Sequence, residues 1–300
     1  MLVSIMITTR NRKEELRNAV QSALAQTAPV EVVVMDDGST DGSAEMLRSE
    51  YPAVRLKRSE KSFGCIVQRN HAARLACGDI IFSIDDDAVF NSPNTVEQTL
   101  REFNHPRIGA VAIPYLEPRK SSVVHQQAPA AEGTYVTDDF IGTAHAVRKD
   151  LFCRLGGYRE LLKHQGEEMD FCIRMLDAGY MVRLGRADAI HHLESPRRSF
   201  QRMDFFGTRN SILFAWQNTP WPYLPGNLLV TTFNCLRWTF KPARLAIRLG
   251  GIGRGFLDFG QAKRKPVRLK TFRLWRELRK NGPLPIQELT VRHLDTPTFE

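Results

Sequence analysis

The hydrophobic pattern of the chain alternates between two periods. Continuous runs rich in Val, Ile, Met and Phe at 3–8, 30–35 and 79–84 predict strands that are buried on both faces. Between these runs, apolar residues recur at helical spacing in 11–26 and 62–77. Alternation of strand and helix is typical of an α/β fold, in which helices flank a mixed, mostly parallel sheet.

Two later segments continue this pattern. The run at 107–116 predicts another strand, and 166–178 predicts a helix that ends before a glycine. We expect the residues from Tyr180 to Ile190 to form one further strand, which ends at His191 and His192. Because ligands of such sheets gather at the carboxyl ends of the strands, polar residues at these ends are the first candidates for a functional site.

Three consecutive aspartates follow the strand at 79–84. Adjacent carboxylates repel one another and are costly to remove from water, so a positive partner is expected, and Mg²⁺ or Mn²⁺ suits such oxygen ligands. On an extended chain, Asp85 and Asp87 point to one side and Asp86 points to the other. An exposed acidic loop is the alternative. One histidine of the pair that ends the later strand is a candidate third ligand.

A second acidic pair, Asp36 and Asp37, follows the strand at 30–35. The pair begins a turn rich in Gly, Ser and Asp, and such a turn can serve only to satisfy backbone groups. A second acidic turn at the same edge of the sheet favours ligand binding instead.

A third acidic cluster opens the helix at 166–178. Its first turn holds Glu167, Glu168 and Asp170, where the helix dipole favours negative charge. Asp170 has a possible partner four residues later in Arg174. Glu167 and Glu168 precede the apolar stripe of the helix, so either one could project into a cleft as a general base.

The composition is that of an ordinary globular protein, with 300 residues, 42% of them hydrophobic and 25% charged. The five cysteines lack metal-ligand spacing, which indicates a reducing, cytoplasmic location. The first apolar run is too short for a signal peptide, and no run approaches the ~18 residues of a membrane span.

A change in composition near Trp221–Pro222 predicts a domain boundary. Residues 1–220 carry the α/β pattern, and residues 221–300 are expected to form a basic, amphipathic, helical extension. The net charge of +9 is uneven, because residues 237–280 contain 14 Lys or Arg and two acidic residues. That segment therefore carries +12 and the remainder −3.

The basic extension has two interpretations. Lys241, Arg244 and Arg248 recur at helical spacing among apolar residues. Such a helix suits the surface of an anionic membrane, and we favour peripheral attachment to the inner face of the cell membrane. A helix packed on the first domain is the alternative.

Taken in order, the motifs VSIMITTRNR, VVVMDDGSTDGS, QRN, GDIIFSIDDD, GEEMDFCIRMLDAGY and HHLES resemble family 2 glycosyltransferases, over residues 3–218. The resemblance implies a GT-A fold, a Rossmann-like nucleotide-diphospho-sugar transferase architecture. It also implies transfer of a sugar from a nucleotide diphosphate donor of the UDP or dTDP type to a glycan or lipid-linked acceptor, with inversion, in cell-surface polysaccharide synthesis.

The resemblance also implies roles for individual residues. Glu168 matches the second member of the family's acidic pair, and this second member deprotonates the acceptor. Asp is usual at that position. His192 stands three residues before Ser195, as in the family's H-x-x-S pattern, and Ser62 stands where Asn is common. The implied nucleotide-sugar-binding residues are Thr8, Arg10, Asp36, Asp37, Arg69, Asp85 and Asp86, and the implied ligands of Mg²⁺ or Mn²⁺ are Asp85, Asp87 and His192.

Two other functions compete with this interpretation. The segment from Asp85 to Val89 also fits the D-x-D-x-[TV] pattern of haloacid dehalogenase phosphohydrolases, but there the first Asp follows the first strand. A nucleic-acid-binding protein would explain the basic extension but not an acidic cleft, and we expect no nucleic-acid partner.

Arg197, Arg198 and Arg209 are either diphosphate ligands or solvated surface charges.

Overall fold

The computed structural model describes residues 2–193, 199–237, 239 and 241–292. Ser195, Arg197 and Arg198, to which the sequence assigned candidate roles, lie outside the described residues.

A nine-stranded sheet forms the centre of the described part of the chain. Its spatial order is β13 (Leu284–Pro285), β9 (Tyr135–Thr137), β11 (Met181–Leu184), β6 (Ile108–Ala112), β10 (His145–Arg148), β4 (Ile80–Asp85), β1 (Val3–Thr9), β2 (Val30–Asp36) and β3 (Arg55–Arg58). Strands β4, β1, β2 and β3 pair in parallel, as do β6 and β11, whereas β10, β9 and β13 join antiparallel. The expected mixed α/β fold is confirmed.

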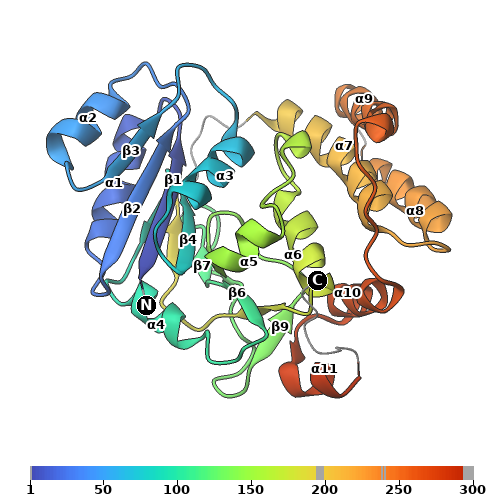
Figure 1. Ribbon diagram of the computed structural model, residues 1–300. Helices are drawn as coiled ribbons and strands as arrows, with labels where there is room; N and C mark the ends of the chain where they lie inside the picture. Colours follow the sequence, from blue (N-terminus) through green and yellow to red (C-terminus); the bar gives the residue numbers. More distant parts are fainter. Residues whose placement is uncertain (1, 194–198, 238, 240, 293–300) are drawn as a thin grey trace.

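Helices cover both faces of this sheet (Figure 1). They are α1 (Lys13–Leu24), α2 (Ser43–Glu50), α3 (Cys65–Leu75), α4 (Thr95–Arg101), α5 (Lys149–Arg154) and α6 (Glu167–Asp177), with short 3-10 turns at Glu160–Leu162 and Asp258–Gly260. Strand β1 shows why its run is apolar throughout. Ile5 and Ile7 pack on one face with Leu16, and Met6 packs on the other face with Ile66.

A small second sheet corrects one expectation. It consists of β5 (Ala88–Phe90), β12 (Ile190–His192), β7 (Tyr115–Leu116) and β8 (Val124–His125). The single strand expected from Tyr180 to Ile190 is instead two strands, β11 in the large sheet and β12 in the small one. The break falls at 185–188, where Gly and Asp disfavour a continuous strand.

The last part of the described chain is helical, as expected. It contains α7 (Phe200–Asn218), α8 (Leu224–Leu236), α9 (Pro242–Leu257), α10 (Leu269–Asn281) and α11 (Ile286–Arg292). Helices α7 to α10 lie together on the side of the molecule away from α1 and α2 (Figure 1). Among the described helices, none has the length and hydropathy to cross a membrane.

The helical part packs closely within itself and also contacts the large sheet. A side chain added at Gly251 of α9 would collide with Thr208 of α7, so these two helices approach each other through this glycine. Strand β13 then returns the chain to the edge of the large sheet, where it pairs with β9. The boundary near Trp221–Pro222 stays a prediction.

Candidate active site

A cavity of about 760 Å³ opens where β1 and β4 end. Of the residues predicted from the sequence, its lining includes Thr8, Arg10, Asp37, Arg69, Asp85, Asp86, Asp87, Glu168 and His192. Asp36 is not among them. Its side chain is fully buried, and its Oδ1 accepts a hydrogen bond from the backbone amide of Ser39 at 2.8 Å. The structure therefore brings Asp37, and not Asp36, to the cavity.

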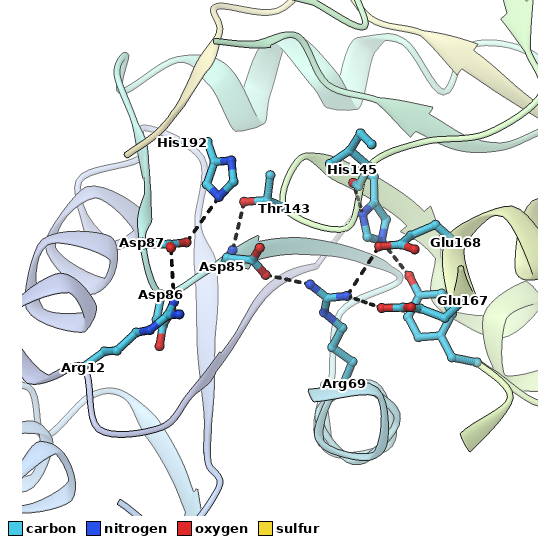
Figure 2. Close-up of polar contacts among 12 residues, drawn as sticks. Arg12, Arg69, Asp85, Asp86, Asp87, Thr143, His145, Glu167, Glu168 and His192 are labelled. Carbon is cyan, nitrogen blue, oxygen red and sulfur yellow. Dashed lines mark hydrogen bonds and ion pairs between the residues drawn. The ribbon is translucent and has the colours of Figure 1, made fainter. Parts of the chain in front are cut away.

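Asp85, Asp87 and His192 meet on one wall of this cavity (Figure 2). One ligand atom from each lies within 4.8 Å of the others, and His192 Nε2 is 3.4 Å from Asp87 Oδ1. Ligands on opposite sides of a Mg²⁺ ion, each about 2.1 Å from it, would be about 4.2 Å apart. Two carboxylates and one imidazole beside an open cavity thus fit a divalent ion after a small inward movement.

The register of the small sheet selects the histidine. In the pairing of β12 with β5, His192 lies opposite Ala88, the residue that follows Asp87. Alternation along the strand then turns His191 to the other side, and it does not line the cavity.

Arg12 offsets part of the acidic charge. Its guanidinium Nη1 lies 2.7 Å from Asp86 Oδ1 and 3.1 Å from Asp87 Oδ2. Asp86 also accepts a hydrogen bond from Thr9 Oγ1 at 2.8 Å. Burial raises the pKa of Asp86 to about 7, although the charge of Arg12 opposes this shift. Thr9 and Arg12 thus hold the Asp86 carboxyl in the wall of the cavity.

Arg69 links the two halves of the site (Figure 2). Its Nη2 lies 2.6 Å from Asp85 Oδ1, and its Nη1 lies 2.9 Å from Glu167 Oε1 and 3.7 Å from Glu168 Oε1. The guanidinium therefore interacts with three carboxylates, and it fixes the distance between the candidate metal ligand Asp85 and the acidic pair of α6.

The two glutamates of α6 differ in access to the cavity. The side chain of Glu168 is 21% exposed and that of Glu167 is 3% exposed. Glu168 also accepts a hydrogen bond from the backbone amide of Gly142. Burial raises the pKa of both carboxyls, and Arg69 opposes the shift. An ionised carboxylate with a raised pKa is a stronger base, and Glu168 is the more accessible one.

Asp37 lines the cavity with its hydrogen-bonding capacity already filled. Its two oxygens accept hydrogen bonds from Ser62 Oγ at 2.5 Å, the amides of Phe63 and Gly64 at 2.7 and 3.0 Å, and Gln68 Nε2 at 2.7 Å. Burial opposes the charged form, but these bonds together hold the pKa of Asp37 below its usual value. Asp37 therefore fixes the loop that precedes α3.

Two other charged candidates serve the packing of the protein. Asp170 is 1% exposed and forms ion pairs with Arg159 at 2.5 Å and Arg174 at 3.0 Å, so the i,i+4 interpretation is confirmed. Arg209 does not reach the cavity as a diphosphate ligand. It is 3% exposed and lies 2.6 Å from Asp258, because α7 buries it against the C-terminal part.

Sequence reasoning missed several residues of the cavity. Arg12, Glu117 and Asp139 all line it, and Glu117 Oε1 is 3.4 Å from His192 Nδ1. Burial raises the pKa of Asp139 to about 7, with Asp138 adding to the effect. Glu117 and Asp139 lie in irregular segments outside any periodic pattern. The adjacent acidic residues Asp138 and Asp139 were the one feature of the sequence that could have indicated Asp139.

Comparison with known sequences identifies the family of the chain. The sequence profile described as Glycosyl transferase family 2 matches residues 4–157, just over half of the chain. The chain is 27% identical over 194 residues to an uncharacterized glycosyltransferase of Haemophilus influenzae, which covers 58% of this chain and 62% of that protein. It is 41% identical over 106 residues to chondroitin synthase of Escherichia coli, with 34% and 15% covered. The chain spans less than two thirds of either relative.

Solved structures show the same architecture. The mannosyltransferase PcManGT of Pyrobaculum calidifontis, in complex with GDP-Man and Mn²⁺, superposes with a TM-score of 0.59 at 20% identity, covering 93% of this chain and 80% of that one. TarS 1–349 of S. aureus, in complex with UDP, gives a TM-score of 0.62 at 17% identity, covering 93% and 87%. These similarities establish the fold.

Proposed function

Because this chain belongs to glycosyl transferase family 2, we propose that it moves a sugar from a nucleotide diphosphate sugar to a hydroxyl of a glycan or lipid-linked acceptor. The role would be in cell-surface polysaccharide synthesis, and a UDP or dTDP donor is the expectation. One observation carries the proposal: a single cavity holds Asp85, Asp87 and His192 on one side of Arg69 and Glu168 on the other.

The two sides of the cavity suit the two halves of one displacement. Glu168 would take the proton of the acceptor hydroxyl, whose oxygen forms the new bond to the anomeric carbon from the face opposite the leaving group. The bond from that carbon to the diphosphate oxygen breaks, and the nucleoside diphosphate leaves. The configuration at the anomeric carbon is therefore inverted.

The donor side requires compensation of negative charge. Asp85, Asp87 and His192 would hold Mg²⁺ or Mn²⁺, which acts as a Lewis acid toward the departing diphosphate. Thr8 and Arg10 line the same cavity and would contact the nucleotide. Arg69 would keep Asp85 and Glu168 at a fixed separation during the reaction.

Donor binding and transfer can be tested separately. Thermal shifts with UDP, dTDP or GDP, each with and without Mn²⁺, would identify the nucleotide, since a ligand of the native state raises apparent stability. Asp87→Asn should lose the Mn²⁺-dependent shift. Glu168→Gln should keep it and lose sugar transfer by about 10²- to 10⁴-fold. Asp150→Asn, at an exposed carboxylate of α5, is the matched control.

The outcomes are separable. An unchanged metal-dependent shift in Asp87→Asn would exclude the metal site. Full transfer by Glu168→Gln would exclude Glu168 as the base and leave Glu167 as the next candidate.

We further propose that residues 221–300 attach the protein to an anionic membrane on its cytoplasmic side. The support is α8, which has no charged residue and exposes Leu229, Val230 and Phe233 by 57–73%. Arg244 and Arg248 instead pair with Asp204 of α7, so part of the basic pattern serves helix packing. Leu229→Gln/Phe233→Gln should reduce sedimentation with vesicles that contain anionic lipid. Unchanged sedimentation would refute attachment through α8.

The two rival functions receive no support. The fold is that of GT-A glycosyltransferases, and Asp85 is the last residue of β4, an interior strand of the large sheet and the fourth strand along the chain, not the first. A nucleic-acid-binding function would leave the acidic cavity, lined by Asp85, Asp86 and Asp87, without a role, because phosphates are repelled there. Sugar transfer is therefore the one function that we propose.

A further inference from the structure

A second, larger cavity lies outside the site described above. It has a volume of about 1240 Å³ and forms a groove between α7, α8 and α10, which we call the α7–α8–α10 groove. In Figure 1, α7 and α10 lie beside α6, the helix that carries Glu168, and α8 lies on the outer side of α7. The groove is larger than the usual ~300–1,000 Å³ of a small-molecule pocket, so it suits an extended ligand.

The groove meets the candidate active site at two methionines. Met169 and Met203 line both cavities, and Met169 directly follows Glu168 in α6. Arg279 of the groove contacts Met169, with Nη1 at 3.0 Å from the sulfur. Methionine side chains are flexible and adapt to different neighbours. A ligand in the groove could therefore place one end near Glu168, past these two side chains.

The floor of the groove is apolar and aromatic. Phe214, Tyr223, Phe272 and Trp275 line it, and their rings contact one another at centroid distances of 5.2–5.8 Å. Val230 extends this floor to the exposed apolar face of α8. A hydrocarbon chain could thus pass from the membrane proposed above into the groove without leaving apolar surroundings.

The rim of the groove on α10 is cationic. Arg273, Arg276 and Lys280 are exposed, lie on one face of the helix and line the groove. Arg273 donates a hydrogen bond to Tyr223 Oη at 3.3 Å, and the guanidinium of Arg276 lies 5.7 Å from the centre of the same ring. Within the described residues, none of these three cations has a carboxylate at ion-pair distance. They remain able to bind phosphate oxygens.

A buried donor points to the same ligand chemistry. Trp275 is 7% exposed, and its Nε1 has no hydrogen-bond acceptor in the described part of the chain. A buried indole N–H normally has an acceptor, and this one belongs to a residue that lines the groove beside the α10 cations. An anionic oxygen bound at the rim would supply the missing acceptor.

Resting on the sugar transfer proposed above, we infer that the α7–α8–α10 groove binds the acceptor, and that the acceptor is a lipid whose phosphate or diphosphate group carries the glycan. The lipid lies on the aromatic floor, the phosphate group lies between the cations of α10 and Trp275, and the glycan reaches Glu168 past Met169. A neutral, soluble glycan would use neither the aromatic floor nor the cationic rim.

Farnesyl diphosphate tests this assignment as a small lipid diphosphate. Calorimetric titration in EDTA prevents metal-dependent binding at the donor site. The wild-type protein should bind farnesyl diphosphate at least about tenfold more tightly than farnesol or inorganic diphosphate, because each lacks one half of the interaction. Asp87→Asn should bind it equally well.

Variants of the groove give the decisive comparison. Arg273→Gln/Arg276→Gln should lower the affinity about tenfold or more, and Trp275→Phe, which keeps an aromatic ring, should lower it by up to about tenfold. Arg101→Gln removes an exposed arginine of α4 that pairs with Glu97, and it should have no effect. An equal loss in Arg101→Gln, or equal binding of farnesol or of inorganic diphosphate, would overturn the inference.

The same protein samples separate this inference from the proposed function. A wild-type protein that binds nucleotide with Mn²⁺ but does not bind farnesyl diphosphate would overturn the groove assignment alone. A wild-type protein that binds no nucleotide with Mn²⁺ would overturn the sugar transfer itself.

Discussion

Gly142 offers a sharp test of how the candidate base is positioned. An ideal Cβ at this residue would lie 2.5 Å from Glu168 Oε1 and 2.8 and 2.9 Å from the two terminal nitrogens of Arg69. Ordinary contact begins at 3.4 Å, so Gly142→Ala would displace the Glu168 carboxylate by about 0.9 Å. Glu168 moves more readily than Arg69, because Arg69 is held by Asp85 and Glu167.

The expected effect is on catalysis and not on folding. The backbone at Gly142 has no positive φ, and the colliding atoms are the ends of side chains, so the unfolding midpoint should change little. A misplacement of about 1 Å can cost about 10²-fold in rate, or about 2.7 kcal/mol in activation free energy. We therefore expect kcat to fall by about 10- to 100-fold.

The assay is release of nucleoside diphosphate during sugar transfer, measured together with the nucleotide Kd in Mn²⁺. The Kd should change little, because the added methyl group meets Glu168 and Arg69 but none of Asp85, Asp87 and His192, and Arg69 stays held by Asp85 and Glu167. Gly253→Ala is the matched control, because its Cβ would meet no atom within 4 Å on the exposed side of α9. A Gly142→Ala protein with wild-type kcat would refute the role of this contact in placing Glu168.

Three further predictions concern ionisable side chains in and around the site. Burial lowers the pKa of His145 to about 3, so only the unfolded chain gains a proton below about pH 6.5. The free energy of unfolding should then fall by up to about 1.4 kcal/mol for each unit by which the pH is lowered from about 6.5 to about 3. Urea unfolding of His145→Gln should show a weaker dependence of this free energy on pH than the wild type, and an equal dependence would contradict the prediction. Arg12→Met removes the arginine that pairs with Asp86 and Asp87, so their negative charge should attract a metal ion more strongly. Mn²⁺ should therefore raise the unfolding temperature of this variant more than that of the wild type, and a smaller rise would count against the metal site. Asp170→Asn breaks the buried ion pairs with Arg159 and Arg174, so it should lower the free energy of unfolding in urea by about 3 kcal/mol. The affinity for nucleotide should not change. Loss of sugar transfer at unchanged stability would instead indicate that Asp170 is the base.

The sequence by itself determined the α/β fold and the edge of the sheet at which the site lies. Its apolar runs predicted β1, β2 and β4, and the acidic clusters stood directly after two of them. Parallel strands bring their carboxyl ends to one edge, so local order along the chain was enough to bring Asp37 and Asp85 to one cavity.

Only the tertiary structure decided which member of each pair serves the site. Asp37 lines the cavity while Asp36 is buried behind it, and His192 faces Asp87 because β12 pairs with β5 in a second sheet. Register between distant strands depends on packing over the whole sheet, and the residues of one strand do not encode it alone.

The charge compensation was also a tertiary outcome. Nothing in the sequence pairs Arg12 or Arg69 with particular acidic residues, yet in the structure they hold carboxylates of two distant segments, 85–87 and the start of α6. The α7–α8–α10 groove likewise forms only where three helices from separate parts of the sequence come together. A pattern along one segment shows which face is apolar or charged, but which faces meet is decided by the free energy of packing the whole chain.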